Sequence, residues 1–549
     1  MRKLRLILGA ALIMALAGCA SIPTSGVVNA GVALSDSSSI EVDILARGPQ
    51  DGDSQEQILQ GFLAAAATPR LDYQVAREFL TSEFSQQWKP DSGATVDQLA
   101  DRSSSATSDS SISLRIKPTA SVSDEGIYAA AQSGAAETRN FTFKQVNGQW
   151  RISQAPQGIL IDQPTFGIVF GSYSLQFFSP NAAFFVPDVR WFARRETTQT
   201  AIVRALVAGP IDWLQPGVVT AIPEGAALEA NSVPLVGSKA TVNLAVQSVP
   251  SADQLSRIQA QLQASLAGLS GVSSVELLIN GTAANVVPLV PAPTIPVVDS
   301  RPAVLTETAF GYQSNLSTEL QTLGALSDAV VKLAPSAIAL GENDSFVAAL
   351  TANGVYRVTA QGAAVVWAGS DWLAPTADPN GGIWSSRAGR LSWQGPDGGT
   401  ASFDPGWNGA VASAVAVSRD GSRIVAAIPD GSAERLVVSA ISRGGDGSPI
   451  GLGAPVAIAV LNGVAGSLSW ASSTAVSVLV SGSDIVSATV GGQSSTLNAP
   501  AGATTVSAGN GVRDVRVLTS TGELMQASGT SWQNRVGQVL VLAQQTGVR

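Results

Sequence analysis

The chain has 549 residues, of which 45% are hydrophobic and 13% charged, with 54 Gly and 28 Pro. This composition is typical of several β-rich domains and unlike that of a coiled coil or a disordered protein. The chain has no histidine, which excludes Ser-His-Asp catalysis, His metal ligands and His-based pH switching. A single cysteine excludes a disulfide framework and an iron–sulfur cluster. With 32 basic and 41 acidic residues and no basic patch, we expect no nucleic-acid partner.

The N-terminus has the pattern of an export signal that ends in a lipid-attachment sequence. Three basic residues among the first five precede an apolar run over 6–17, which is too short for a permanent membrane helix. The run ends in Leu16, Ala17, Gly18 and Cys19, which resemble a bacterial lipoprotein box recognised by a signal peptidase. An ordinary signal peptide that happens to contain a cysteine is the alternative.

The lipoprotein box predicts a signal peptide over 1–18 and a mature chain that begins at Cys19. Cys19 would carry an S-diacylglycerol and an N-palmitoyl group. Two or more acyl chains give stable anchoring, at ~0.8 kcal/mol per buried methylene. An acidic chain gains nothing from anionic lipid, so these acyl chains must hold it at the membrane. The predicted location is the extracytoplasmic face of the cell membrane.

An anchored tether and a first folded domain are predicted next. Residues 19–52 are rich in Ser, Gly, Ala and Asp with little periodicity, which indicates a flexible tether. Over 53–165, Asp53 and Glu56 have the spacing of a capping box, and Asp72 is the expected cap of a second helix that continues to Phe84. A Ser-rich loop over 103–111 and four strands follow. This order resembles the cystatin/NTF2-like α+β fold.

The region 166–297 has the pattern of a second α+β domain. Strands near 177 and 184–191 precede a helix that starts at Thr197 or Thr198 and ends at Gly209-Pro210. Ser251 and Gln254 form a capping box before a second helix, and a strand over 275–279 ends in an Asn-Gly turn. The segments Leu-Val-Ala-Gly-Pro and Ala-Ile-Pro-Glu-Gly resemble the GerMN domain. That module of envelope and spore-germination lipoproteins implies binding or assembly.

A Pro-rich linker or strand entry near 288–296 leads into an all-β region over 298–549. Short strand-like runs alternate there with Asn-Gly and Asp-Gly turns at 353, 380, 420 and 510. Because a propeller blade takes ~40–50 residues, this region suits a β-propeller of five or six blades. Such rings often close by borrowing a strand from the other terminus. A pair of β-sandwiches is the competing fold.

The last region also contains the residues that could do chemistry. Neither a nucleophile elbow nor a Gly-Lys phosphate loop occurs in the chain, and we predict no catalytic, cofactor-binding or metal-binding residue. A glycosidase would need two facing carboxylates, although Asp before Gly is more often a turn residue. The candidate carboxylates are Asp371, Asp378, Asp397, Asp404 and Asp420. Seven Trp favour blade packing over a stacking platform for glycan or peptide; they are Trp367, Trp372, Trp384, Trp393, Trp407, Trp470 and Trp532.

The domain order as a whole resembles the actinobacterial lipoprotein LpqB family. The residues that carry this resemblance are Cys19, the segments Val186-Pro187-Asp188 and Arg190-Trp191, and the run over 206–214. The resemblance implies a partner, because the family accompanies the MtrA–MtrB two-component system and acts on the extracytoplasmic sensor part of the MtrB histidine kinase. It further implies roles in signalling, cell-wall homeostasis and division.

Three functions therefore stay open at this point. The first is a non-enzymatic accessory that binds a membrane sensor kinase. The second is an envelope module that binds peptidoglycan or another wall polymer through the propeller. The third is a carboxylate-based hydrolase.

Overall fold

A computed structural model describes residues 46–131, 134–314, 317, 319–481 and 484–545. The predicted signal peptide over 1–18 and its peptidase site lie outside the described residues, as does Cys19. Most of the predicted tether over 19–52 lies outside them too. The described chain contains an N-terminal α+β domain, a middle α+β domain and a C-terminal β-propeller, as the sequence predicts.

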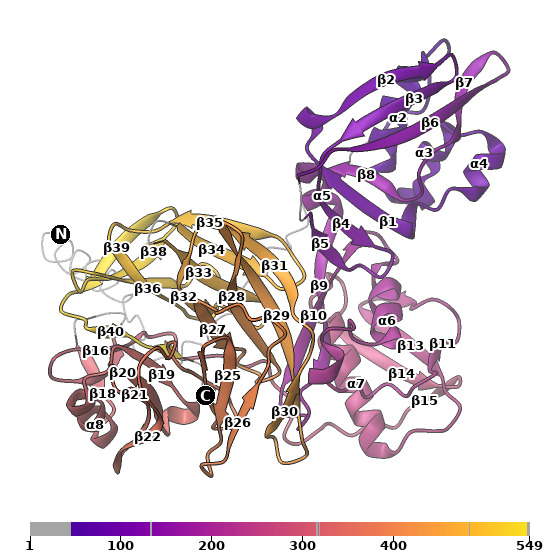
Figure 1. Ribbon diagram of the computed structural model, residues 1–549. Coiled ribbons are helices and arrows are strands. Elements are labelled where there is room, and N and C mark those ends of the chain that lie inside the picture. Colours follow the sequence, from indigo (N-terminus) through magenta and orange to yellow (C-terminus); the bar gives the residue numbers. More distant parts are fainter. Residues whose placement is uncertain (1–45, 132–133, 315–316, 318, 482–483, 546–549) are drawn as a thin grey trace, which may run out of the picture. The chain divides into compact units, whose positions relative to one another are not determined.

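The N-terminal domain places short helices on one mixed and one antiparallel sheet (Figure 1). Its sheets have the orders β5-β4-β1-β8 and β2-β3-β6-β7, and α2 contacts β7 and β8. The helices are α2 (Gln55–Ala66), α3 (Gln74–Glu78) and α4 (Ser82–Gln87). The strands are β1 (Gly93–Asp97), β2 (Ser103–Ser108), β3 (Ser111–Ile116), β4 (Pro118–Ser123), β5 (Tyr128–Ala130), β6 (Glu137–Val146), β7 (Gln149–Gln154) and β8 (Ile159–Asp162).

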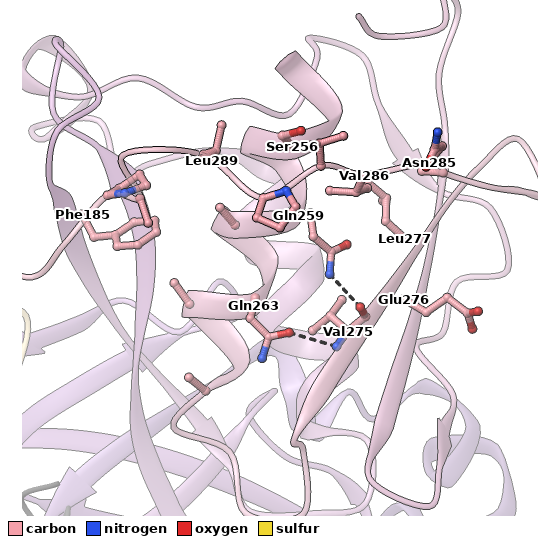
Figure 2. A pocket seen from close by; sticks show the side chains of 18 of the residues that line it. Phe185, Ser256, Gln259, Gln263, Val275, Glu276, Leu277, Asn285, Val286 and Leu289 are labelled. Carbon is pink, nitrogen blue, oxygen red and sulfur yellow. Dashed lines mark hydrogen bonds between the residues drawn. The ribbon is translucent and has the colours of Figure 1, made fainter. Parts of the chain in front are cut away.

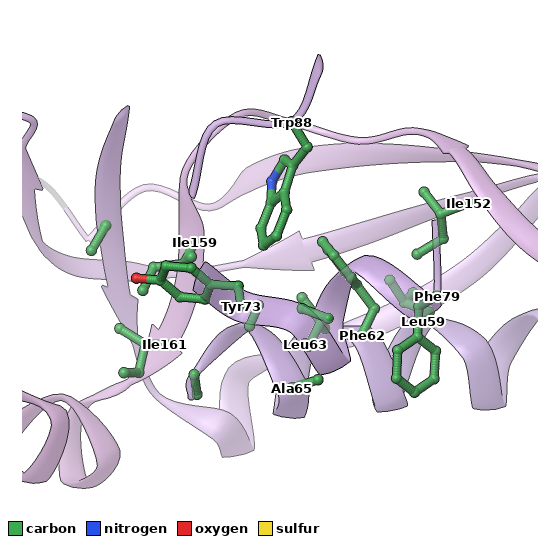
Figure 3. Packing of buried hydrophobic residues seen from close by; sticks show 14 of the residues in the cluster. Leu59, Phe62, Leu63, Ala65, Tyr73, Phe79, Trp88, Ile152, Ile159 and Ile161 are labelled. Carbon is green, nitrogen blue, oxygen red and sulfur yellow. The ribbon is translucent and has the colours of Figure 1, made fainter. Parts of the chain in front are cut away.

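The core of this domain is built around Trp88 (Figure 3). The Trp88 ring is 2% exposed and meets Phe62 edge-on at 5.1 Å and Tyr73 at 5.9 Å between centroids. Such T-shaped pairs add ~0.5–1.5 kcal/mol to the free energy of burial. Burial, followed by the negative charge of Asp91, raises the pKa of Tyr73 well above its ordinary value.

Three sequence predictions for this domain are wrong in detail. The capping box of α2 is formed by Ser54 and Gln57, one residue later than the Asp53–Glu56 pair. The second helix starts only at Gln74, because Leu71 to Tyr73 have left-handed φ angles between 47° and 57°, so Asp72 does not cap it. It is interrupted over 79–81, where Phe79 and Thr81 form backbone hydrogen bonds with Ile152. The expected Ser-rich loop is strand β2, whose side chains are all exposed. A strand with neither face buried has no hydrophobic alternation to reveal it.

The middle domain combines a β-hairpin with a mixed sheet. Helix α7 (Ala252–Leu266) connects the parallel strands β13 and β14 and covers β9. Its buried face presents Ile258, Leu262 and Leu266 to the core. The other elements of the domain are α5 (Gln163–Val169), β9 (Phe170–Phe178), β10 (Phe185–Ala193), α6 (Thr198–Ala208), β11 (Ala227–Leu228), β12 (Leu235–Val236), β13 (Lys239–Ala245), β14 (Ser274–Ile279) and β15 (Thr282–Ala283).

The predicted helix ends of this domain agree with the structure in part. Thr197 is the N-cap of α6 without a side-chain hydrogen bond to the helix, while Gly209 ends the helix at φ 101°. Ser251 caps α7, but the side chain of Gln254 donates to Ala221 O instead of closing the box. The Asn280-Gly281 turn joins β14 to β15 with both φ angles positive, as predicted.

Residues 303–545, as far as the structure describes them, form a propeller of six blades. Blade 1 contains β16 (Ala303–Leu305), β17 (Phe310–Gln313), β18 (Leu320–Thr322) and β40 (Val541–Leu542). Blade 2 contains β19 (Ala337–Leu340), β20 (Val347–Thr351), β21 (Gly354–Thr359), β22 (Gly362–Ala368) and β41 (Gln544–Gln545). Blade 3 contains β23 (Thr376–Ala377), β24 (Ile383–Arg387), β25 (Arg390–Gln394) and β26 (Thr400–Phe403).

The remaining blades follow the same antiparallel order. Blade 4 contains β27 (Ala414–Val417), β28 (Arg423–Asp430), β29 (Ala433–Arg443), β30 (Pro449–Leu452) and β31 (Val456–Leu461). Blade 5 contains β32 (Ala465–Trp470), β33 (Ala475–Val480), β34 (Asp484–Thr489) and β35 (Ser494–Asn498). Blade 6 contains β36 (Ala503–Ala508), β37 (Val515–Thr519), β38 (Leu524–Ser528) and β39 (Ser531–Val536).

Two features of the propeller are decisive for its fold. The C-terminal strand β40 pairs with β16, so the ring closes with strands from both ends of the region, as expected for this architecture. The predicted Asn-Gly and Asp-Gly turns at 353, 380 and 420 lie in the hairpins β20–β21, β23–β24 and β27–β28. The expectation of an all-β region is wrong in one respect, because helix α8 (Ala325–Leu333) lies between blades 1 and 2.

Candidate functional site

The middle domain contains a cavity of about 800 Å³, within the usual size of ligand sites. We call it the groove: it lies between α7, the strands β14 and β15, and residues 284–293, which we call the strap. Figure 2 shows α7 between Phe185 and β14, with the strap passing across one end of the helix. Small side chains at one-turn spacing on α7 leave this space open; they are Ser256, Ala260, Ala264 and Ala267.

Two glutamines fix the floor of the groove to the edge of β14. The Nε2 of Gln259 donates to Val275 O at 2.7 Å, and Val275 N donates to the Oε1 of Gln263 at 3.0 Å (Figure 2). Each amide uses one of its two polar ends. Because Val275 needs a donor at its carbonyl and an acceptor at its N–H, the orientation of both amides is determined. Gln259 Oε1 and Gln263 Nε2 therefore remain as an acceptor and a donor in side chains that line the groove.

The strap has backbone hydrogen bonds only near its ends among the described residues, and its Ala284 and Val286 pack against the core of the domain. Ala284 N donates to Leu277 O at 2.9 Å, and beyond the strap Thr294 N donates to Ala183 O at 3.2 Å. Among the described residues, no backbone–backbone hydrogen bond involves 285–293. Val287 and Val290 in this stretch are 63% and 92% exposed. The Pro-rich segment expected to be a linker or strand entry is thus a wall of the cavity in the middle domain.

Sequence reasoning did not identify the groove. A Gln pair at i, i+4 looks like an ordinary solvent face of a helix, and the Pro-rich composition of the strap indicated a linker. The available signal was weak: four small residues share one side of a helix that is followed by an uncharged Val- and Pro-rich segment.

The two buried candidate carboxylates have structural partners. Asp378 is fully buried, and its oxygens accept from Trp384 Nε1 and Arg443 Nη2, both at 2.8 Å, and from the N–H groups of Asn380 and Gly382. Asp420 is 4% exposed; it pairs with Arg423 and accepts from Ser418 and Ser422 in its own turn. These contacts favour the turn interpretation over catalysis.

The other three candidate carboxylates are exposed and bond locally. Asp397 accepts from Gly399 N and Asp404 from Gly406 N, both at 3.0 Å, while Asp371 accepts from Ser370 Oγ. Each contact lies within two residues of its aspartate, as in an Asx-type turn. Within the described part of the chain, no three His, Cys, Asp or Glu side chains come together to form a cluster that could hold a metal ion.

The tryptophans of the propeller mostly pack against other side chains and do not form an exposed binding surface. Four are at most 7% exposed, namely Trp384, Trp393, Trp407 and Trp470. The half-buried Trp372 stacks on Trp367 at 5.0 Å, and the Arg387 guanidinium lies over its ring. Trp532 is half-buried and donates to Asn498 O. Because the rings are engaged within the blades, the structure gives little support to a glycan platform.

The propeller contains a small cavity and, separately, a buried arginine that joins three of its blades. A cavity of about 220 Å³ is lined by inner strands of the blades. Arg419 is 3% exposed and donates to Trp470 O, Ala508 O and Asn510 Oδ1, so it links blade 4 to blades 5 and 6. Burial lowers the pKa of Arg419 to about 10, and the charge of Asp514 opposes this shift. The Arg419 guanidinium joins the blades through its two Nη atoms, while its buried Nε has no hydrogen-bond partner among the described residues.

The segments that carried the family resemblance meet in the middle domain. Arg190 forms a bidentate ion pair with Asp188, in which Nε donates to Oδ1 at 3.0 Å and Nη2 to Oδ2 at 2.8 Å. Both side chains are at most 4% exposed. Ile211 N donates to the same carboxylate at 2.9 Å. The Val-Pro-Asp segment on β10 is thereby bound to the Gly-Pro-Ile segment after α6. A bidentate buried pair of this kind gives geometric specificity, so these residues hold the fold.

Comparison with known proteins agrees with each of the three domains. Residues 48–167 match the family model described as "Lipoprotein LpqB, N-terminal domain", residues 174–285 the model "Sporulation and spore germination", and residues 315–540 the model "Lipoprotein LpqB beta-propeller domain". These matches and the fold define the class: a multidomain lipoprotein with a germination-type module and a C-terminal propeller. The chain belongs to the LpqB lipoprotein family.

The relatives are similar over different shares of their length. Lipoprotein LpqB of Cutibacterium acnes is 30% identical over 286 residues, which cover 51% of this chain and 47% of that protein. The chain thus spans about half the length of this relative. Lipoprotein LpqB of Bifidobacterium longum is 26% identical over 446 residues, covering 74% of this chain and 72% of the relative. A solved nidogen/laminin complex aligns with 44% of this chain and 96% of the solved chain, at 11% identity and a TM-score of 0.32. This similarity is too low to indicate a function.

None of the helices described between residues 46 and 545 is both long and apolar enough to cross a bilayer. The family is named for lipoproteins and not for an enzymatic activity.

Proposed function

We propose that this protein is a lipid-anchored lipoprotein of the extracytoplasmic face that binds the sensor part of an MtrB-like histidine kinase. By binding, it would tune two-component signalling that acts on the cell wall and division, without chemistry of its own. The anchor would be the acylated Cys19. The observation that carries the binding role is the groove, an apolar cavity of about 800 Å³ in a domain of a lipoprotein family.

The geometry favours this function over the two alternatives. The hydrolase hypothesis loses support because Asp378 and Asp420 are buried in structural ion pairs with Arg443 and Arg423. The wall-polymer hypothesis loses support because the propeller tryptophans engage one another or the blade cores. The groove, by contrast, offers apolar surface together with a few polar groups, which is the usual composition of a binding site.

Membrane anchoring makes a weak contact sufficient. Two proteins confined to one membrane surface meet at an effective concentration that approaches millimolar for a flexible tether. To alter kinase output, the lipoprotein must bind one sensor conformation more tightly than the other, and the shift cannot exceed that difference in affinity.

The test is reconstitution of the kinase in vesicles with and without the full lipidated chain. We expect binding to the sensor domain and a change in the rate of response-regulator phosphorylation. Absence of binding, together with unchanged phosphorylation, would contradict the proposal. The matched control is the lipoprotein anchored in separate vesicles, which removes the shared surface and should remove the effect.

A further inference from the structure

We propose that the groove binds an extended, uncharged, apolar peptide segment through the two glutamine amides on its floor. This inference rests on the proposed function, because the segment would belong to the sensor part of the kinase. It adds the chemistry of recognition: a short stretch of β-like backbone, with small apolar side chains entering the cavity.

The two glutamine amides present a pattern of donors and acceptors that a peptide backbone can match. Gln259 and Gln263 already treat Val275 as a neighbouring strand would, because one donates to its carbonyl and the other accepts from its N–H. The opposite ends of the same amides, Gln259 Oε1 and Gln263 Nε2, repeat this acceptor and donor toward a further strand. A peptide unit that donates its N–H to Gln259 and accepts with its carbonyl from Gln263 would continue the ladder by one rung.

The free amide ends also exclude a purely hydrocarbon ligand from the floor of the groove. Hydrocarbon placed against the free amide ends would leave a donor and an acceptor unsatisfied, which costs free energy for each group. A fatty acyl chain therefore fits the walls of the groove but not its floor. A peptide satisfies both, as in recognition by strand addition, where backbone hydrogen bonds give affinity and pockets for side chains give specificity.

The lining of the groove contains little charge. Glu276 is the charged residue among those that line the groove, and its carboxylate is paired with Lys239 at 3.0 Å. The rest of the lining is apolar or amide, including Ala260, Ala264 and Leu289. A segment with an ionised side chain would lose water there without gaining a partner. The groove therefore selects an uncharged segment.

The strap leaves a way for a peptide to enter the groove. The strap is held by backbone hydrogen bonds near its ends and by the packing of Ala284 and Val286, and its middle makes no backbone hydrogen bond among the described residues. Its movement would break no backbone ladder, so a peptide can enter beside it. Val287 and Val290, both exposed on the strap, would then cover apolar side chains of the bound segment.

Single-atom substitution tests the rung directly. Gln263→Glu keeps an oxygen to accept from Val275 N but replaces the free Nε2 donor with a second acceptor, which repels a peptide carbonyl. We expect binding to weaken about tenfold, equivalent to ~1.4 kcal/mol. The matched control is Gln74→Glu, the same change at an exposed first residue of α3, where a negative charge is favourable. Its affinity should equal that of the unchanged protein.

The assay uses the full lipidated chain in nanodiscs and fluorescent, end-capped heptapeptides read by anisotropy. One set is tiled across the sensor domain, and a second set is a library of uncharged sequences unrelated to the sensor. We expect uncharged members to bind and members with Lys or Asp at the centre to fail. Ala264→Phe fills the groove and should abolish binding, while its thermal melt shows that the domain still folds.

The outcomes separate the two proposals. If the intact sensor domain binds, and Gln263→Glu and Ala264→Phe leave its affinity unchanged, the groove proposal is wrong and the function stands. If library peptides bind and respond to both substitutions while the sensor domain does not bind, the sensor as partner is wrong and the groove chemistry stands. A fluorescent fatty acid that binds more tightly than any peptide, unaffected by Gln263→Glu, would overturn the peptide in favour of an acyl chain.

Discussion

At the scale of single residues, the propeller depends on carboxylates that lie inside its turns. Asp378 holds Trp384, Arg443 and two backbone N–H groups at once, while its own side chain is fully buried. Removing one partner of a buried pair is strongly destabilising, because the other charge remains buried without compensation. The side chain of Arg443, 3% exposed, is that remaining charge.

We therefore expect Asp378→Ala to lower the free energy of unfolding of the propeller by ~3–5 kcal/mol. The measurement is denaturant unfolding followed by Trp fluorescence. Asp430→Ala is the matched control, since its pair with Arg435 is 36–46% exposed and such pairs are worth at most ~1 kcal/mol. Equal losses for the two variants would show that Asp378 is not a structural anchor.

Cys19 gives a second prediction at this scale. If its thiol carries the lipid, Cys19→Ala removes every acyl chain, and the chain is expected to remain unprocessed or to be released into the medium. Metabolic labelling with a fatty acid, followed by membrane fractionation, measures both effects. Cys19→Ser retains size and polarity and should behave in the same way, because an oxygen does not replace the thioether. Labelled, membrane-bound Cys19→Ala protein would refute the lipoprotein box.

At the scale of elements, sequence patterns predicted what burial enforces. Helix α7 and strand β13 were predicted because one face of each is buried, which imposes periodicity on the sequence. Strand β2 and the late start of α3 after Leu71 to Tyr73 were not, since an exposed edge strand and three left-handed residues have no periodic signal. The groove was missed for a related reason: its floor consists of polar atoms whose role depends on β14, which is distant in sequence.

Two glycines of blade 2 allow a prediction about turn chemistry. Gly354 and Gly362 both have positive φ, at 138° and 132°. A Cβ at Gly354 would lie 2.1 Å from Trp367 O, whereas a Cβ at Gly362 would meet nothing within 4 Å. Both Ala variants carry the strain of the backbone, about 1–2 kcal/mol, but Gly354→Ala adds a clash with backbone. We expect Gly354→Ala to lower the melting temperature clearly more than Gly362→Ala, as measured by calorimetry. Equal melting temperatures would rule out the close approach.

At the scale of the whole molecule, the sequence predicted a propeller but left five and six blades open. The recognisable turns lie 27, 40 and 90 residues apart, so the period could not be counted. The structure explains this spacing. The turn at 353 lies between β20 and β21, whereas those at 380, 420 and 510 lie between the first two strands of blades 3, 4 and 6. The corresponding turn of blade 5 contains neither Asn-Gly nor Asp-Gly. The number of blades is set by closure, in which strands from both ends of the region must meet.

That closure yields the last prediction. Strand β40 pairs with β16, and β41 pairs with β19. Val541 and Leu542 are 6% and 2% exposed, so truncation after residue 539 should lose about 3–6 kcal/mol of apolar burial and leave blade 1 with an unpaired edge. We expect the full chain cut there to show a lower propeller melting temperature and rapid hydrogen exchange in β16. Truncation after residue 545, which keeps both strands, is the control. Unchanged hydrogen exchange in β16 after truncation at residue 539 would mean that the ring does not depend on its C-terminal strand.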